Sequence, residues 1–421
     1  MSHGDWKDMF KAIQANDKDL VLFYLKNGID INYQHPEYMT NALCESIRCK
    51  NENLVCLLLE HGASADIREM DSGKTPLQIA RDLAFQQAIA LLENHQCSLS
   101  PIPENHKVKP NQNMTMKAAF CTKYGPPEVI EIREVARPTP KSNEILVKIM
   151  ASTINSGDVR VRGLQVEGFM KLMMRLIVGW NKPKKPILGV TYAGTVEEIG
   201  KDVKNFKKGD RVFGVTAFRF GCHAEYTTIP EKSMVLHVPK KANFEEAAAI
   251  LFGGQTAVFF LHKMGIKTRQ NPKVLILGAT GSVGTSAIQI AKYYRANVTA
   301  VCSSASKELC HSLDADKVIA YDQEDIYTIT DRFDMILDAV GKYTKKQCKH
   351  LLTSDGIFKT VGGLEYASES IDQLELLSKI YDEGKLNPVI DMVFSLDDIV
   401  QAHRYVDTGR KKGNVLIMMN G

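Results

Sequence analysis

The stretch that decides the fold is residues 273–284, KVLILGATGSVG, in which a run of apolar residues leads directly into a glycine-rich turn. Residues 283–294 follow with the apolar spacing of an amphipathic helix, and residues 297–302 have the pattern of a second buried strand. A strand, a helix and a strand in this order predict a parallel sheet covered by helices. We therefore expect a doubly wound α/β sheet in this part of the chain.

The glycines of this turn suit a loop that binds phosphate groups. Gly278, Gly281 and Gly284 would let the chain turn off the strand, let the backbone approach a pyrophosphate, and let the helix pack closely on the sheet. The helix N-terminus then offers unpaired N–H groups and a positive dipole end to the phosphates. The Gly-x-x-Gly-x-x-Gly spacing departs from the usual dinucleotide fingerprint, and a structural turn with no ligand is the alternative.

The end of the second strand indicates which nucleotide would bind. A site selective for NAD places Asp or Glu there to hold the ribose 2′-hydroxyl, whereas this chain has CSSASK at residues 302–307. The serine hydroxyls can donate hydrogen bonds to a 2′-phosphate, and the Lys307 ammonium can neutralise it. These residues predict NADP(H), with NADPH bound at least about tenfold more tightly than NADH. A solvated turn without a ligand is again the alternative.

The composition excludes several other classes of protein. The 421 residues are 44% hydrophobic and 24% charged, and the formal net charge of +4 gives nucleic-acid binding no support. No apolar run reaches the roughly 20 residues of a membrane span, and the N-terminus has no signal-peptide pattern. The nine cysteines include no Cys-x-x-Cys pair, which favours reduced thiols. Together these features predict a cytoplasmic, soluble protein.

An internal repeat lies nearer the N-terminus. Residues 57–63, LLLEHGA, match residues 23–29, FYLKNGI, at a shift of 34 residues, and the third copy opens with the sequence TPL at 75–77. Each copy predicts a short helix, a polar turn, and a Leu-rich helix that ends near a glycine. The pattern resembles ankyrin repeats over residues 5–96, and a helical bundle with chance similarity is the alternative.

Residues 97–114 join the repeats to the rest of the chain. Pro101, Pro103 and Pro110 lie among polar residues without periodicity, which predicts a semi-rigid interdomain linker. The repeats would form an arm that docks a protein partner. Because fewer than three full copies are present, the alternative is an arm that depends on the following domain for its stability.

Eight ordered motifs lie beyond the linker. They are KGDRVFG at 208–214, AEY at 224–226, EAAA at 246–249, GQTA at 254–257, LDAD at 313–316, VIAY at 318–321, DAVG at 338–341 and VGG at 361–363. This set resembles the medium-chain dehydrogenase/reductase superfamily, in its zinc-free quinone oxidoreductase (zeta-crystallin-like) branch. The resemblance implies a GroES-like substrate domain at 115–242, completed by 386–421, and a Rossmann NADP(H)-binding domain at 243–385. It also implies that hydride transfer from cofactor to substrate takes place in the cleft between these two domains. It further implies a homodimer in which the edge strands of the two nucleotide-domain sheets pair.

The zinc-ligand positions of related dehydrogenases hold other residues in this chain. Asn155, three residues before Asp158, stands in place of a cysteine, and Gly189-Val190-Thr191 replaces Gly-His-Glu. Cys222 and His223 lack companions that would complete a ligand set. We therefore expect no metal. Without a Lewis acid, hydride delivery to a conjugated acceptor is favoured over oxidation of simple alcohols.

The resemblance implies the remaining site residues. Asn155 would donate its amide to the developing oxygen charge, and Asp158 would position groups in the same loop; a simple turn cap is the alternative. The implied cofactor contacts are Thr256, Gly278, Thr280, Gly281, Ser282, Val283, Gly284, Ser303, Ser304, Lys307, Tyr321, Val340, Gly341, Val361, Gly362 and Gly363. Asn414 stands where relatives often carry Lys, so a cofactor contact there stays open.

Two functions fit these residues. The first is an NADPH-dependent reductase of quinones or α,β-unsaturated carbonyl compounds, with an ankyrin arm for docking. The second is a non-catalytic interaction protein that senses NADP(H) and acts through its ankyrin repeats. The Met-rich segment 169–180, FMKLMMRLIVGW, is either a lid over an apolar substrate or a core helix.

Overall fold

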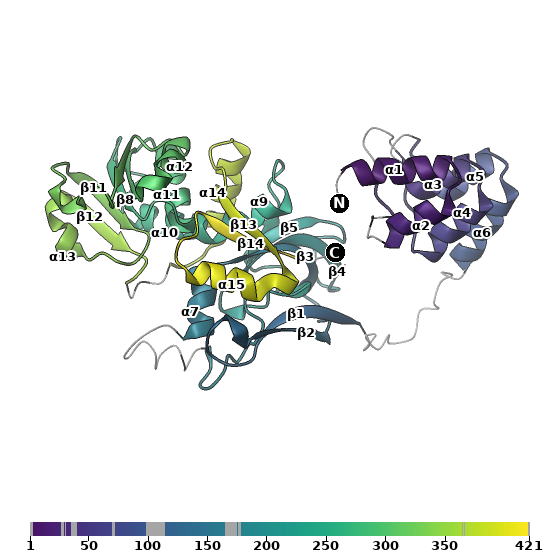
Figure 1. Ribbon diagram of the computed structural model, residues 1–421, viewed down its shortest axis with the longest axis horizontal. Coiled ribbons are helices and arrows are strands. Elements are labelled where there is room, and N and C mark those ends of the chain that lie inside the picture. The colour runs from purple at the N-terminus through teal and green to yellow at the C-terminus, as the bar shows by residue number, and fades with distance from the viewer. Residues whose placement is uncertain are drawn as a thin grey trace. The chain divides into compact units, whose positions relative to one another are not determined.

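Figure 1 shows a computed structural model of the chain, which consists of two compact units, residues 1–108 and 109–421. The structure describes residues 3–26, 29, 31–34, 40–69, 72–97, 114–164, 175, 178–363, 365 and 367–419. The two units are considered separately below.

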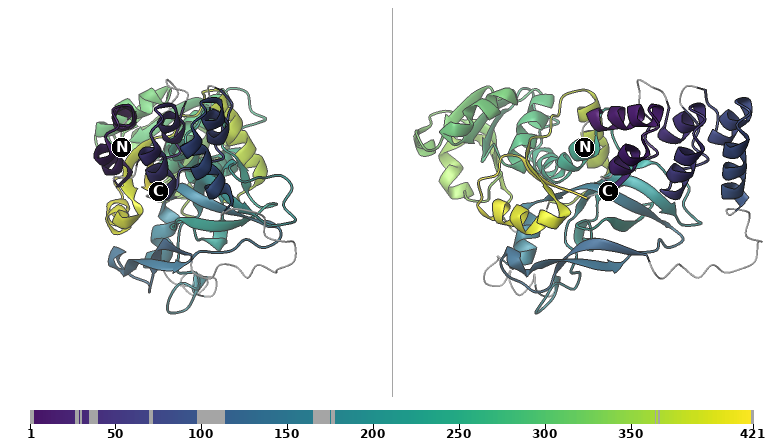
Figure 2. Two further views of the ribbon diagram at one scale, coloured as in Figure 1. Left: turned by 90° about the vertical axis from the view of Figure 1, so that its right-hand side faces the viewer. Right: turned by 45° about the vertical axis from the view of Figure 1, so that its right-hand side comes forward.

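The first unit is a stack of helix pairs, seen side by side in the right-hand view of Figure 2. Its helices are α1 (His3–Gln14), α2 (Lys18–Lys26), α3 (Ala42–Arg48), α4 (Glu52–Glu60), α5 (Pro76–Asp82) and α6 (Gln86–Cys97). Asn41 and Asn51 cap α3 and α4 by accepting hydrogen bonds from the backbone, and Thr75 forms a capping box with Gln78. Apolar side chains from all six helices form one continuous core, and neighbouring pairs pack against one another.

The GroES-like part of the second unit is built on a mixed sheet. Its seven strands have the order β13-β14-β3-β4-β5-β7, with β6 paired to β3, and β1 and β2 form a separate two-stranded sheet. The bounds are β1 (Thr115–Cys121), β2 (Ile130–Ala136), β3 (Glu144–Ile154), β4 (Thr191–Ile199), β5 (Arg211–Val215), β6 (Tyr226–Pro230), β7 (Val235–His237), β13 (Ile390–Ser395) and β14 (Asn414–Met418). Because β14 pairs with β3, the end of the chain returns to this sheet.

The nucleotide-domain part is a parallel sheet with the order β10-β9-β8-β11-β12. Its strands are β8 (Lys273–Leu277), β9 (Asn297–Cys302), β10 (Lys317–Ala320), β11 (Phe333–Asp338) and β12 (Leu352–Thr360). The α/β prediction is therefore confirmed, and β8 and β9 occupy the predicted ranges. The central strands read as continuous apolar runs because helices cover both faces of a parallel sheet.

Helices and short 3-10 turns complete the second unit. The helices are α7 (Ser156–Gly163), α9 (Phe244–Ala249), α10 (Leu251–Lys263), α11 (Ser282–Tyr293), α12 (Lys307–Ser312), α13 (Lys345–Cys348), α14 (Ile371–Asp382) and α15 (Ile399–Asp407). The 3-10 turns are η1 (Pro127–Val129), η2 (Ala217–Arg219), η3 (Ser304–Ser306), η4 (Ile326–Thr328), η5 (Lys349–Leu351) and η6 (Leu396–Asp398).

Residues 244–263, which form α9 and α10, are long and apolar enough to cross a membrane. In this fold 67% of their most apolar window is buried, and α10 packs against α11 and α14. A Cβ atom on Gly253 would lie 2.2 Å from the Ser282 carbonyl oxygen, so only glycine allows α10 to approach the start of α11. The apolar character of this segment is explained by its place in the core.

Candidate active site

The loops predicted to bind the nucleotide meet along one edge of the parallel sheet. Gly278 follows β8, Ser303 follows β9, Tyr321 follows β10, Val340 follows β11 and Val361 follows β12. The carboxyl ends of parallel strands lie at the same edge, where open α/β sheets bind their ligands. Five segments spread over more than eighty residues are therefore brought to one edge (Figure 1).

The glycine turn after β8 has room in front of the helix N-terminus. Gly278 has a φ of +75°, and a Cβ atom on Gly284 would lie 2.3 Å from the Gly278 carbonyl oxygen, so both positions require glycine. At Gly281 the conformation is ordinary, and a Cβ atom there would have only that oxygen within 4 Å, at 3.9 Å. Gly281 thus leaves open space beside the first turn of α11. This geometry fits a pyrophosphate.

The end of the chain closes onto this turn. The Gly413 amide donates to the Thr280 carbonyl oxygen at 2.7 Å, and the Ser282 hydroxyl donates to Asn414 Oδ1 at 2.6 Å. Asn414 Nδ2 donates in turn to the Val389 carbonyl oxygen at 3.0 Å. Asn414, whose cofactor contact the sequence left open, therefore links the phosphate turn to β14.

Asp338, at the end of β11, holds two nucleotide loops together. Its Oδ1 atom accepts hydrogen bonds from the Val340 and Gly341 amides at 3.1 and 3.0 Å, and its Oδ2 atom accepts one from the Thr360 hydroxyl at 2.8 Å. A Cβ atom on Gly362 would lie 2.6 Å from Gly341 Cα, so the two loops touch. The Val340 and Gly341 amides belong to the loop after Asp338's own strand, whereas Thr360 ends the neighbouring strand β12, so this link between the two loops has no local signal in the sequence.

A carboxylate lies beside the residues predicted to contact the adenosine part of the nucleotide. The Ser304 amide donates to Asp322 Oδ1 at 2.8 Å and the Ser304 hydroxyl donates to Asp322 Oδ2 at 2.7 Å. These hydrogen bonds hold the pKa of the Asp322 carboxyl below its usual value. Residues 302–307 contain no acid, but parallel pairing of Ala320 with Cys302 places the end of the third strand, and with it Asp322, beside them.

The other predicted adenosine contacts lie in the same loops. The Ser303 hydroxyl donates to the Ser306 hydroxyl at 3.3 Å, and Lys307 Nζ donates to Gln323 Oε1 at 3.2 Å. The Tyr321 side chain is 56% exposed, which leaves its ring available to a ligand.

Asn155 begins α7 and caps it. Its Oδ1 atom accepts hydrogen bonds from the Gly157 and Asp158 amides at 2.8 and 3.2 Å, while Asp158 Oδ2 accepts one from the Asn155 amide at 3.0 Å. The Asn155 side chain therefore caps α7 through its oxygen, as the turn-cap alternative predicts. Asn155 is 3% exposed, and its Nδ2 atom has no hydrogen-bond partner among the described residues. The Nδ2 group of Asn155 is therefore a buried hydrogen-bond donor that no described residue uses.

Asp158 is occupied inside the protein. Its Oδ1 atom accepts a hydrogen bond from the Gly189 amide at 3.2 Å. Burial raises the pKa of its carboxyl, although His223 and the amides of Asn155 and Gly189 act in the opposite direction. Gly189 has a φ of +84°, and a Cβ atom there would lie 2.4 Å from His223 Cδ2. Asp158 thus positions Asn155 and Gly189.

The segments predicted to carry the catalytic and the nucleotide-binding residues approach each other at α10. The position of a Cβ atom on Gly157 lies 3.9 Å from Phe252 Cε2, and the Thr256 hydroxyl donates to the Phe252 carbonyl oxygen at 2.9 Å. The loop of Asn155 is therefore adjacent to the helix turn that carries Thr256.

Four family models match the sequence. A model described as an alcohol dehydrogenase GroES-like domain covers residues 141–240, and two described as zinc-binding dehydrogenase cover 282–387 and 364–417. Ankyrin repeats, in three copies, match residues 9–100. The 2-methylene-furan-3-one reductase of Solanum lycopersicum is 33% identical over 319 residues, which are 72% of this chain and 79% of that protein. The chain belongs to the medium-chain dehydrogenase/reductase superfamily.

Further comparisons narrow this assignment. The human protein named NAD(P)H oxidoreductase RTN4IP1, mitochondrial, is 30% identical over 73% of this chain and 90% of its own length. The structure of the quinone oxidoreductase from Coxiella burnetii is 28% identical, with a TM-score of 0.66, and covers 73% of this chain and 100% of that one. This chain is an enzyme, an NAD(P)H-dependent oxidoreductase of the zeta-crystallin-like branch fused to ankyrin repeats.

The family models raise the question of zinc, and the donors in this chain do not fit it. Asp158 already accepts two backbone hydrogen bonds, and His223 Nε2 lies 3.1 Å from the Thr153 carbonyl oxygen. Burial raises the pKa of the Cys222 thiol to about 12, which opposes the thiolate a metal needs. Within the described part of the chain, no three His, Cys, Asp or Glu side chains are grouped to hold a metal ion.

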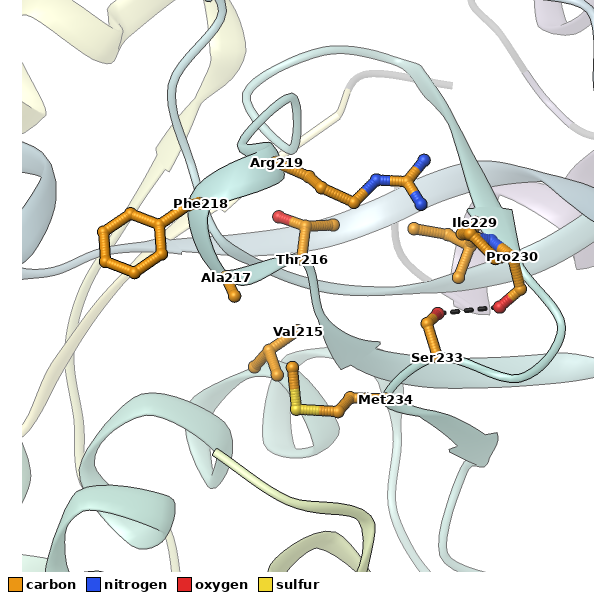
Figure 3. Close-up of a pocket in the computed structure, with 9 residues that line it drawn as sticks. All are labelled: Val215, Thr216, Ala217, Phe218, Arg219, Ile229, Pro230, Ser233 and Met234. Carbon is orange, nitrogen blue, oxygen red and sulfur yellow. Dashed lines mark hydrogen bonds between the residues drawn. The ribbon is translucent and has the colours of Figure 1, made fainter. Parts of the chain in front are cut away.

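Two further regions lie apart from the loops described so far. Segment 169–180 lies outside the described residues apart from Arg175 and 178–180, so its assignment as lid or core helix stays a prediction. A cavity of about 370 Å³ lies between η2 and the β6–β7 turn; Figure 3 shows the side chains that line it. Its lining comprises Val215, Thr216, Ala217, Phe218, Arg219, Ile229, Pro230, Ser233 and Met234. None of these is a predicted catalytic or cofactor residue.

Proposed function

We propose that this enzyme is an NADPH-dependent reductase of quinones or α,β-unsaturated carbonyl compounds that acts without a metal ion. One observation carries the proposal: the Nδ2 atom of Asn155 is a buried donor with no partner among the described residues, in a loop whose Gly157 lies next to Phe252 of α10. A donor in this position can stabilise negative charge that develops on a carbonyl oxygen.

The bound nucleotide would supply the hydride. Different residues of the chain would contact each part of this nucleotide. The turn at 281–284 would hold the pyrophosphate. The 2′-phosphate on the adenosine ribose would lie near Ser303, Ser304 and Lys307. Thr256 and the loops that Asp338 joins would line the nicotinamide. Asp158 has both oxygens engaged by backbone amides and is a positioning residue, so the proton that completes the reduction comes from solvent.

A conjugated acceptor suits this arrangement. Charge on a quinone or enone spreads over its π-system, so one amide donor can provide the stabilisation that a simple ketone would need from a Lewis acid. The name of the Solanum relative, a reductase of an exocyclic enone, supports this substrate class.

The test is steady-state turnover of a panel of quinones and enones, combined with fluorescence titration of NADPH and NADH. We expect turnover with NADPH and tighter binding of NADPH than of NADH. The Ser303→Asp variant should reverse that preference, because its carboxylate repels a 2′-phosphate and accepts a ribose hydroxyl. Tight NADPH binding without turnover of any acceptor would favour the non-catalytic sensor instead.

Zinc independence can be tested separately. Dialysis against EDTA and phenanthroline should leave turnover within about twofold of the untreated enzyme, because the donors near Asn155 are engaged within the protein. Metal analysis of the dialysed sample serves as the control. Stoichiometric zinc, with activity that falls as zinc is removed, would contradict the proposal.

One further proposal concerns the cell compartment in which the enzyme is found. Every cysteine with a described side chain is a free thiol, which suits a reducing compartment, and we propose the cytoplasm. Because some relatives are named mitochondrial or chloroplastic, imaging of the tagged full-length chain is the necessary test.

We also propose that the enzyme forms a homodimer through the edge strand β12. Sedimentation of the full-length chain can test this oligomeric state.

A further inference from the structure

The nucleotide edge contains one carboxylate whose position the reaction does not explain. Asp322 is the second residue after β10, and both of its oxygens accept hydrogen bonds from Ser304, one from the backbone amide and one from the hydroxyl. Nearby acids behave differently: Asp325 accepts a hydrogen bond from the Tyr327 amide at the start of η4, and Glu324 is exposed with no role at Ser304.

The Ser304 donors are among those that a 2′-phosphate would use. A carboxylate that accepts from an amide and a hydroxyl imitates two oxygens of a bound phosphate. Asp322 is exposed and its lowered pKa keeps it ionised at neutral pH, so an incoming 2′-phosphate meets a negative charge in its own position. The 2′-hydroxyl of NADH, by contrast, can donate a hydrogen bond to that carboxylate.

We propose that Asp322 sets the cofactor selectivity of this enzyme by occupying the Ser304 donors, opposing the 2′-phosphate of NADPH and admitting NADH. Lys307 acts in the other direction, since its ammonium lies in the same loop region, hydrogen-bonded to Gln323 next to Asp322. The balance gives an enzyme that binds both nucleotides, with an NADPH preference below the tenfold expected from residues 302–307 alone. This inference rests on the proposed assignment of Ser303, Ser304 and Lys307 to the adenosine end.

The experiment compares the full-length chain with Asp322→Asn and with the control Glu324→Gln, which removes the same charge two residues away. Fluorescence titration at one ionic strength gives dissociation constants for NADPH and NADH. Competition by 2′,5′-ADP and by 5′-AMP isolates the phosphate from the nicotinamide. We expect Asp322→Asn to tighten NADPH and 2′,5′-ADP by about fivefold or more, and to weaken NADH and 5′-AMP, which share the free 2′-hydroxyl that the carboxylate would accept. The control should change each constant by less than about twofold.

The alternative outcomes are distinct. If both nucleotides bind and Asp322→Asn changes their ratio no more than Glu324→Gln does, the inference is wrong while the proposed function stands. If the unmodified chain binds neither nucleotide, the proposed function fails and the inference falls with it. Circular dichroism and thermal unfolding verify that the variants fold, and Asp322→Ser repeats the comparison with a smaller side chain.

Discussion

At the scale of single residues, Asn155 combines a structural and a proposed chemical role in one amide. Its oxygen caps α7, and its nitrogen is buried without a partner among the described residues. A buried donor without a partner costs free energy, so proteins usually retain one where a ligand will use it. This division of one side chain allows the two roles to be separated by mutation.

Replacing Asn155 with serine should retain the cap and remove the amide donor at the Nδ2 position, which the shorter serine hydroxyl does not reach when its oxygen caps the helix. Serine caps helices about as well as asparagine, so the free energy of unfolding should change by less than about 0.5 kcal/mol. Loss of one oxyanion donor should lower kcat about 100-fold. Stopped-flow and steady-state assays with NADPH and an enone measure the second effect. An unchanged kcat in a folded variant would show that Asn155 is only a helix cap.

Glu69, in the ankyrin repeats, gives a prediction about pH. Its carboxylate is buried, which alone would raise its pKa, but hydrogen bonds from Arg48, Thr40 and Ser72 outweigh burial and lower the pKa to about 2. A depressed pKa in the folded state stabilises the fold above the unfolded-state pKa, near 4.5, and this stability is lost as the pH falls towards 2.

We therefore expect the contribution of Glu69 to the free energy of unfolding of the first unit to be constant between about pH 7 and about pH 5.5. This contribution should decrease below about pH 4.5. Glu69→Gln should cost about 2 kcal/mol at pH 7 and flatten that decline. Urea unfolding of a Trp180→Phe chain, in which Trp6 is the remaining tryptophan, reports on this unit alone. A decline of equal steepness in the Glu69→Gln chain would contradict the prediction.

At the scale of elements, the turn from β8 into α11 contains two glycines with different tasks. Gly284→Ala would bring a Cβ atom to 2.3 Å from the Gly278 carbonyl oxygen, which forces α11 away from the turn. Gly281→Ala meets no protein atom closer than 3.9 Å and fills only the space in front of the helix. The first change acts on folding and the second on the ligand.

Gly284→Ala should lower the free energy of unfolding by about 2 kcal/mol or more, whereas Gly281→Ala should leave it nearly unchanged. Gly281→Ala should nevertheless weaken NADPH about tenfold or more, since the pyrophosphate must approach the backbone there. Thermal unfolding and nucleotide titration of both variants check the two effects. Normal NADPH binding by Gly281→Ala would place the pyrophosphate elsewhere.

At the scale of the whole molecule, each of the two compact units has its own core. Ankyrin repeats present surfaces that bind other proteins, and we propose this docking role for the arm at 5–96, joined through the linker at 97–114. Deletion of residues 1–110 should leave a folded enzyme with turnover within about twofold of the full chain. Aggregation or loss of activity would show that the repeats stabilise the reductase instead.

Much of the fold could be predicted because its signals are local. The apolar run at 273–277, the glycines that follow it and the repeat of 34 residues each lie within one or two elements, whose backbone preferences act over short distances. The same holds for the positions of Asn155 and Asp158 at a helix start. For these, nearby residues in the chain decide the conformation.

The sequence by itself determined a parallel nucleotide sheet, its glycine turn and the ankyrin arm, since side-chain periodicity and glycine spacing are properties of contiguous residues. Only the tertiary structure decided that Asp322 meets Ser304, that Asp338 joins two loops, and that one amide hydrogen-bonding group of Asn155 is left over. The physical reason is the order β10-β9-β8-β11-β12: neighbours in a parallel sheet are separated by helices in the chain, so the contacts between their ends carry no local signal.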